Sequence, residues 1–341
     1  MSVDDARLSV ARARTAGVFP AASVEVGSSA DVLWKEDFGT SAHTPFDLAS
    51  LTKPLATTTI VMELVRTGEL RLEELVSTFF DEWRGADRRH ITVRDLLEHA
   101  SGLPARLIDA PPANRREFEH DICAIQLEYA ARTKSVYSDL GFILLGFLAA
   151  DRGGAPLSAL FDRIVAPLNL DFLTFGVPSA FRGLAAPTRP MTEDFRRGRD
   201  LVGEVHDNYA AALGGVAGHA GLFGTAGGVG AFARAAMRAL RGDAEGPPPL
   251  SRHLMRQFVA RSGVPGSSRA LGWDTMLPTS SCGTKMSESA FGHVGFTGTS
   301  LWIDPARDRY FVLLTNRVLG GGTLDEMRTV RRAFHDALGD V

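Results

Sequence analysis

Strand-like patterns at both ends of the chain and helical patterns between them predict a mixed α/β fold of the α+β kind. The strand-like patterns occupy residues 22–35 and 293–315, and helical patterns dominate from residue 57 to about residue 170. Because strands from the two ends can complete one sheet, we expect an antiparallel sheet of N- and C-terminal strands, flanked by terminal helices, with a largely helical domain inserted. The 341 residues are enough for one such core with an insertion.

The first elements follow from hydrophobic periodicity and turn chemistry. Apolar side chains recur at helical spacing over residues 4–17, which predicts an amphipathic helix. Residues 22–26 and 31–35 flank the sequence Gly-Ser-Ser-Ala at 27–30, which is typical of a hairpin. An apolar helical pattern then covers residues 57–66. The N-terminal part therefore contributes a helix and two paired strands before the helical region begins.

The middle of the chain contains one strongly apolar segment and one glycine-rich segment. Residues 140–150 form an apolar run about half as long as the ~20 residues of a membrane span, which predicts a buried helix. Residues 214–230 contain eight glycines and no proline, which predicts a turn-rich stretch. A helix is expected to follow over residues 231–241.

The last quarter of the chain returns to strand-like patterns. Polar and apolar residues alternate over 293–304, and a turn sequence follows at 305–308. Residues 310–315 form an apolar run that predicts a buried strand, and a terminal helix is expected over 323–338.

These elements divide the chain into two expected domains. Residues 1–60 and 225–341 would form the sheet domain, and residues 61–224 the mainly helical insertion. The active site is expected between them.

Composition and charge exclude several classes of function. The net charge is −3, from 37 basic and 40 acidic residues, so no nucleic-acid or anionic-membrane partner is expected. Neither the phosphate-binding G-x-x-x-x-G-K-[ST] motif nor the zinc-binding H-E-x-x-H motif occurs, and we expect neither a cofactor nor a metal. Two cysteines, Cys123 and Cys282, are too few for a disulfide framework; buried free thiols are favoured over a pair.

The first residues carry no sign of an export signal. Residues 1–5 are acidic, where a signal peptide would be basic, and no apolar segment follows them. We therefore expect a cytoplasmic protein, or a periplasmic or secreted one if a leader precedes this sequence. Its oligomeric state is left open.

The sequence Ser50-Leu-Thr-Lys53 places a hydroxyl and an amine three residues apart, where a helical pattern begins. Residues at i and i+3 share a helix face, so Lys53 can approach Ser50 Oγ. The motif alone is weak, but only four lysines occur against 33 arginines, and a lysine here by chance is correspondingly less expected. An arginine at this position could not lose a proton and act as a base.

Two further motifs follow in chain order, Tyr137-Ser-Asp139 and His293-Val-Gly295. With S-x-x-K, this order and these separations resemble the serine β-lactamase and penicillin-binding-protein superfamily, and more narrowly its class C and esterase (family VIII-type) branch. The resemblance extends over roughly residues 46–316 and includes three flanking segments, Asp95–Pro104, Gly218–Thr225 and Gly292–Ser300.

The resemblance implies a β-lactamase/transpeptidase-like fold and a role for each matched residue. Ser50 would be the nucleophile that forms an acyl-enzyme, and either Lys53 or Tyr137 would accept its proton. Each candidate base needs a lowered pKa, which the sequence does not assign to one of them. The oxyanion hole would consist of the backbone N–H groups of Ser50 and Phe296.

Three positions depart from the pattern of the family. Asp139 stands where Asn is common; a carboxylate accepts hydrogen bonds but cannot donate one to a substrate carbonyl, and it could pair with an amine. An N-cap role for Asp139 is an equal alternative.

His293 replaces a lysine of the family and gives a pH-dependent positive charge, and Val294 replaces a threonine that binds a substrate carboxylate. For His206 and His219 a structural role is favoured over lining the site, whereas Asn208 is left undecided.

The departures favour a carboxylesterase that acts on short acyl esters through an acyl-enzyme, with weak β-lactam hydrolysis as an allowed side activity. A β-lactamase or a D-alanyl-D-alanine carboxypeptidase is the alternative enzyme. The missing export signal counts against it, because those substrates lie outside the cytoplasm. The alternative outside the enzymes is a penicillin-recognising sensor that is acylated without turnover. In each case the partner is a small-molecule ester or β-lactam, and its acyl-chain length is left open.

Overall fold

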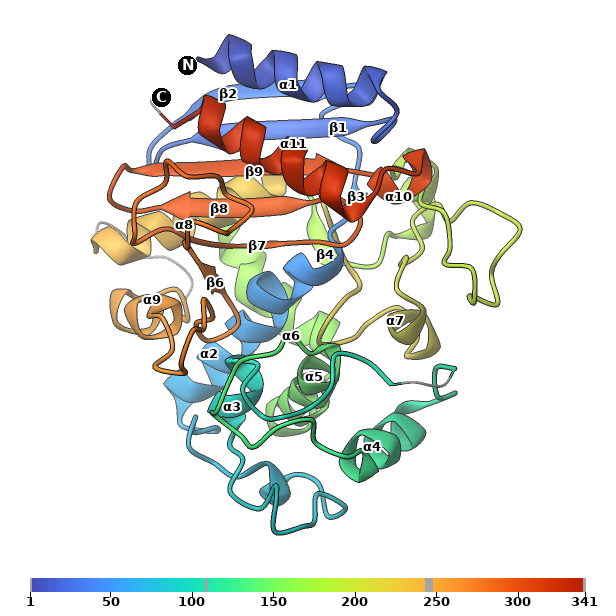
Figure 1. Cartoon of the computed structure of the whole chain (residues 1–341), viewed down its shortest axis with the longest axis vertical. Helices are drawn as coiled ribbons and strands as arrows, with labels where there is room; N and C mark the ends of the chain where they lie inside the picture. Colours follow the sequence, from blue (N-terminus) through green and yellow to red (C-terminus); the bar gives the residue numbers. More distant parts are fainter. Residues whose placement is uncertain (1, 108–109, 243–247, 340–341) are drawn as a thin grey trace.

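A six-stranded antiparallel sheet of N- and C-terminal strands forms one part of the fold in the computed structural model, which describes residues 2–107, 110–242 and 248–339 (Figure 1). The strand order is β2-β1-β9-β8-β7-β6, so the N-terminal hairpin pairs directly with the last strand of the chain. The strands are β1 (Ala22–Gly27), β2 (Val32–Phe38), β6 (Asp274–Thr275), β7 (Phe291–Val294), β8 (Ser300–Asp304) and β9 (Arg309–Thr315). This confirms the expected fold class.

Helices cover both faces of this sheet (Figure 1). Because successive side chains of a strand point to opposite faces, Trp302 and Phe311 pack in one cluster with the terminal helices, whereas Leu301 and Val312 belong to the cluster that contains the helix on the other face. These helices are α1 (Val3–Thr15) and α11 (Leu324–Ala337) on the first face and α8 (Ala226–Arg241) on the second.

The other part of the molecule is mainly helical. Its α-helices are α2 (Thr59–Thr67), α3 (Val93–Leu97), α4 (Arg115–Ala124), α5 (Asp139–Gly153), α6 (Leu157–Val165) and α7 (Asn208–Ala212); α9 (Arg252–Val259) and α10 (Arg317–Gly320) follow later in the chain. Short 3₁₀ or π segments are η1 (Ala49–Leu51), η2 (Lys53–Thr58), η3 (Val76–Thr78), η4 (Ala166–Leu168) and η5 (Ser179–Leu184). A small sheet contains β3 (Phe46–Asp47), β4 (Leu173–Phe175) and β5 (Leu222–Gly224) in the order β3-β5-β4.

Helix α5 lies at the centre of the helical part. Its residues from Asp139 to Ala149 are buried, which agrees with the buried helix expected over 140–150. In the described residues no single helix is long and apolar enough to cross a membrane; α5 and the segment 157–168 meet the length and composition test only as a pair bent by 73°. Both cysteines, Cys123 and Cys282, are buried and free, and burial raises the pKa of each thiol to about 12.

Two sequence predictions about local structure are wrong. The alternating segment 293–304 is two strands, β7 and β8, joined by a turn in which Gly298 has a φ of +111°. The glycine-rich stretch also ends earlier than expected, because α8 begins at Ala226. A side chain at Gly228 would lie 2.3 Å from Phe172 O, so this glycine serves close packing rather than a turn.

Candidate active site

Ser50 lies in the tight turn η1, directly after β3, and the buried carboxylate of Asp47 fixes this turn. One oxygen of Asp47 accepts the Ala49 N–H at 2.8 Å, and the other accepts the His206 N–H at 2.6 Å. Ala49 has a φ of +47°, which is costly for a residue with a side chain and marks a turn that its surroundings hold in place. Burial raises the pKa of Asp47 to about 6, and the hydrogen bonds from the His206 and Ala49 N–H groups offset only part of that effect.

Three of the predicted residues meet at this turn. Lys53 begins the π segment η2, and its Nζ lies 3.1 Å from Ser50 Oγ. Tyr137 comes from the loop before α5 and donates a hydrogen bond to Ser50 Oγ at 2.6 Å. Lys53 Nζ also donates to Tyr137 Oη at 2.5 Å, so each of the three groups contacts the other two.

Asp139 occupies the first turn of α5, but it is not the N-cap of that helix. Ser138 is the N-cap, because its side chain accepts the Gly141 N–H, so the N-cap alternative for Asp139 is wrong. The carboxylate of Asp139 instead accepts from Lys53 Nζ at 2.7 Å through one oxygen and from Arg106 Nη1 at 3.1 Å through the other. Each oxygen of Asp139 therefore already pairs with a cation of the protein, and the expected pairing with a substrate amine stays a prediction.

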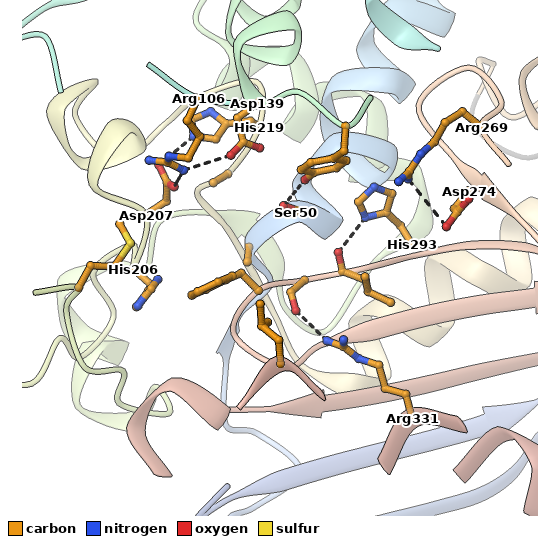
Figure 2. Close-up of a pocket in the computed structure, with 18 residues that line it drawn as sticks. Ser50, Arg106, Asp139, His206, Asp207, His219, Arg269, Asp274, His293 and Arg331 are labelled. Atoms are coloured by element: carbon orange, nitrogen blue, oxygen red, sulfur yellow. Dashed lines mark hydrogen bonds and ion pairs between the residues drawn. The ribbon is translucent and has the colours of Figure 1, made fainter. Parts of the chain in front are cut away.

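Arg106 links Asp139 to a second group of polar residues. Its guanidinium donates to Asp207 at 2.9 Å and to Asn208 at 2.7 Å, and it lies 3.9 Å from the centre of the Tyr209 ring. Asp207 Oδ1 in turn lies 2.8 Å from Nε2 of the buried His219, a residue that also lines the cavity. Figure 2 shows Arg106, Asp139, Asp207 and His219 gathered on one side of Ser50.

The protonation states of Lys53 and Tyr137 follow from burial and mutual contact. Burial alone would lower the pKa of Lys53, but the contacts with Asp139 and Tyr137 outweigh it and raise that pKa above its ordinary value. Burial raises the pKa of Tyr137 more than Lys53 lowers it. In the free protein the pair is therefore an ammonium beside a neutral phenol. Neither Lys53 nor Tyr137 therefore has the lowered pKa expected of the base.

His293 lies on the other side of Ser50, at the end of β7, with its ring centre 6.0 Å from that of Tyr137. Its pKa is held well below the ordinary value by burial and by the nearby charges of Arg269 and Lys53. The expected pH-dependent positive charge is therefore wrong for the free protein, because the imidazole is neutral at neutral pH. Arg269 carries the charge on this side instead, 5.3 Å from the centre of the Tyr137 ring and 3.8 Å from Asp274.

Ser50 and Phe296, the residues of the two predicted oxyanion donors, line the same cavity. Among the described residues, neither the Ser50 N–H nor the Phe296 N–H donates to another group. Gly295 lets the turn after β7 approach the Ser50 turn, because a Cβ at this position would lie 2.5 Å from Leu48 O and 2.1 Å from Thr299 Oγ1. Both N–H groups are thus without an acceptor in the described residues, and their role as oxyanion donors stays a prediction.

These groups line one cavity of about 390 Å³ (Figure 2). His206 and His219, for which a structural role was favoured, also lie in its wall. The predicted and additional lining residues are Ser50, Arg106, Tyr137, Asp139, His206, His219, Arg269, His293, Gly295, Phe296 and Arg331. In the described parts of the chain, no three His, Cys, Asp or Glu side chains are placed to hold a metal ion.

A comparison with known proteins identifies the family. The sequence profile of the β-lactamase family matches residues 9–335. The chain belongs to the β-lactamase family. It is 32% identical over 308 residues to an N-acetylmuramyl-L-alanine amidase of Bacillus subtilis (strain 168), covering 81% of this chain and 68% of that protein. It is 30% identical over 322 residues to a protein of Escherichia coli (strain K12) provisionally named a D-alanyl-D-alanine carboxypeptidase, covering 84% of this chain and 72% of that protein.

Solved structures of this family share the fold. EstCE1, described as a hydrolase with promiscuous acyltransferase activity, superposes with a TM-score of 0.76 at 19% identity over 97% of this chain and 98% of its own. A β-lactamase/D-alanine carboxypeptidase from Pseudomonas syringae gives 0.76 at 18% identity over 98% of each chain. The chain is thus a serine hydrolase of the β-lactamase family with a class C-like fold.

Several residues of the cavity were missed in the sequence. Arg106, Arg269 and Arg331 come from segments far apart along the chain, and in a sequence with 33 arginines none of them stands out. Asp47, which holds the Ser50 turn without lining the cavity, lies three residues before the S-x-x-K motif, and this proximity is the signal that the sequence offers for it.

Proposed function

We propose that the chain is a carboxylesterase that acts on short acyl esters through an acyl-enzyme on Ser50. The observation that carries the proposal is the mutual contact of Ser50 Oγ, Tyr137 Oη and Lys53 Nζ at 2.5–3.1 Å. Such contact of a nucleophile with a base that is itself oriented by a third group is the arrangement that covalent catalysis requires.

Tyr137, as its phenolate, is proposed as the base. Lys53 is held as an ammonium by Asp139, which leaves Tyr137 as the group in contact with Ser50 Oγ that can take its proton. Ser50 Oγ then bonds to the ester carbonyl carbon, and the electron pair of the carbonyl moves to its oxygen. The N–H groups of Ser50 and Phe296 would bind that oxygen. The proton taken by Tyr137 passes to the leaving alcohol as the ester bond breaks, and water repeats the sequence on the acyl-enzyme.

The preference for esters rests on the groups that would hold the carboxylate of a penicillin or peptide. His293 is neutral and Val294 has no hydroxyl. The carboxylate of Asp139, already paired with Lys53 and Arg106, cannot donate to the side-chain carbonyl of such a substrate. None of these groups offers a new charge or donor to an anionic substrate.

A D-alanyl-D-alanine carboxypeptidase or β-lactamase is the second candidate, because Arg269 lines the cavity and its pairing with Asp274 is long, at 3.8 Å. A guanidinium in this position can bind a carboxylate. Relatives named as an amidase and as carboxypeptidases also support this candidate.

The test compares kcat/KM for p-nitrophenyl butyrate, a chromogenic cephalosporin and a D-alanyl-D-alanine peptide. We expect the ester to be the best of the three and Ser50→Ala to abolish its turnover. A higher kcat/KM for the cephalosporin or the peptide would replace the proposal by the second candidate. A stable adduct on Ser50 without repeated turnover would instead indicate a penicillin-recognising sensor.

A further inference from the structure

Two buried arginines reach the turn that carries Phe296. Arg331 on α11 and Arg317 on α10 are 5% and 6% exposed. In the described part of the chain neither forms an ion pair with a carboxylate, although buried arginines are ordinarily paired. Burying an unpaired charge destabilises a protein, so we expect these two guanidinium groups to serve a function.

Both guanidinium groups donate to backbone carbonyls of one short segment. Arg331 Nη2 donates to Gly295 O at 2.7 Å and to Thr299 O at 2.9 Å. Arg317 donates to Phe296 O through Nε at 3.2 Å and Nη2 at 2.5 Å, and its Cζ lies 4.8 Å from the centre of the Phe296 ring. The carbonyls before and after the Phe296 N–H are therefore each bound by a cation.

The bond to Gly295 O acts directly on the Phe296 N–H. The Gly295 carbonyl and the Phe296 N–H belong to one planar trans peptide, in which they point in opposite directions. A guanidinium that fixes the carbonyl therefore fixes the direction of the N–H on the other side of the plane. It also withdraws electron density from the peptide, which makes the N–H a stronger donor, as in other cooperative hydrogen-bond chains.

No carboxylate of the described residues balances the positive charge of Arg331. Burial and the neighbouring charge of Arg317 lower the pKa of Arg331 to about 9. Arg331 also lines the cavity that contains Ser50 (Figure 2). A fixed positive charge at this wall favours negative charge that develops in the cavity.

We propose that Arg331, supported by Arg317, is a positioning residue of the oxyanion hole: it orients and polarises the Phe296 N–H and places a positive charge behind the oxygen that becomes negative. The inference rests on the proposed acyl-enzyme mechanism and adds a group to it. Its action is strongest when the oxygen carries a full charge, so it raises kcat rather than substrate affinity.

The experiment uses Arg331→Met, which removes the charge at similar length, and Arg331→Lys, which keeps a charge and a donor. Arg328→Gln is the matched control, because Arg328 lies on the exposed side of the same helix and donates to Thr279 O. Thermal unfolding establishes that each variant is folded. Kinetics are measured with p-nitrophenyl butyrate, and inhibition with phenylboronic acid, whose adduct with a serine is tetrahedral and anionic.

For Arg331→Met we expect kcat to fall about 10- to 100-fold, less than the 10²–10³-fold typical of losing an oxyanion donor outright, with KM nearly unchanged. The inhibition constant for phenylboronic acid should rise by a similar factor. Arg331→Lys should recover part of both losses, and Arg328→Gln should match the wild type.

A loss of thermal stability with unchanged kcat and boronate inhibition in the folded fraction would overturn the inference. So would a rise in KM restricted to anionic substrates, because Arg331 would then bind the substrate directly. Equal ester turnover by wild type and Ser50→Ala would instead overturn the proposed function on which the inference rests. The two failures are therefore distinguishable.

Discussion

Tyr137 is the residue that contacts both Ser50 Oγ and the Lys53 ammonium, and its environment determines when it can act as a base. Burial raises the pKa of its phenol, and Lys53 offsets only part of that effect. The reactive phenolate is thus a small fraction of the protein at neutral pH, and this fraction grows as the pH rises. The positive charge of Lys53 must persist over the same range, which its own raised pKa allows.

This protonation pattern predicts the pH dependence of catalysis. We expect kcat/KM for a neutral ester to keep rising from pH 7 to about pH 9, the pH at which Arg331 begins to lose its charge. Tyr137→Phe should lower kcat about 10²- to 10⁴-fold, as expected for loss of a general base, and remove the rise with pH. The measurement is the pH–rate profile of the two proteins. A plateau below pH 8 in the wild type would assign the base to another group.

The binding of an anionic substrate, in contrast to catalysis, should not depend on pH through His293. Its pKa is held well below the ordinary value, so it has no charge to lose between about pH 5 and pH 8. The KM of an anionic substrate such as a cephalosporin should therefore be constant over that range. Steady-state kinetics across the range check this, and a KM that increases through about pH 6.5 would show that the imidazole titrates there.

At the scale of elements, the site depends on the approach of two turns. Thr297 Oγ1 donates to Asp47 O at 2.7 Å, and Thr299 Oγ1 donates to Leu48 O at 3.0 Å, so the turn after β7 is bonded to the turn that holds Ser50. Gly295 makes this approach possible, since any Cβ there would collide with Leu48 O.

Gly295→Ala should therefore separate the two turns. We expect a loss of stability of about 1–3 kcal/mol from overpacking and a larger relative loss of ester turnover, because the Phe296 N–H moves away from Ser50. Gly263→Ala is the control, because nothing lies within 4 Å of its Cβ position. Chemical denaturation and kcat measured side by side test this; wild-type kcat in Gly295→Ala would contradict it.

The sequence predicts helices and strands well where a hydrophobic pattern continues over many residues. It predicts them poorly where tertiary packing determines the end of an element. The terminal helices, the hairpin of β1 and β2 and the buried strand β9 follow from their patterns. The break between β7 and β8 does not, because strand-like alternation continues across the turn. Likewise the start of α8 is hidden by glycines such as Gly228, which serve close packing against Phe172.

At the scale of the molecule, the fold brings together groups that the sequence keeps apart. Ser50 and Lys53 precede α2. Tyr137 lies in the loop before α5 and Asp139 in its first turn, whereas His293 lies near the end of β7. Local motifs and the family resemblance were sufficient to find these residues. Arg106, Arg269 and Arg331 could not be found in the same way, since only tertiary packing brings them to the cavity.

The stability of the whole molecule should depend on pH through Asp47, the buried carboxylate beneath the Ser50 turn. The pKa of Asp47 rises from 3.8 to about 6 on folding, so the folded state binds the proton more tightly and the contribution of this group to stability is lost as the pH rises through 6. The difference between the two values corresponds to about 3 kcal/mol. Relative to Asp47→Asn, the wild type should lose up to that amount between pH 4 and pH 7. Urea unfolding of both proteins at each pH measures it, and a difference independent of pH would contradict it.

The acyl-enzyme on Ser50 is tested most directly by intact-mass spectrometry of rapidly quenched reactions with p-nitrophenyl butyrate. We expect a transient butyryl adduct that maps to the peptide containing Ser50 and disappears as substrate is consumed. Ser50→Ala should show neither the adduct nor turnover. Turnover without an adduct on Ser50, or equal ester hydrolysis by Ser50→Ala, would contradict it.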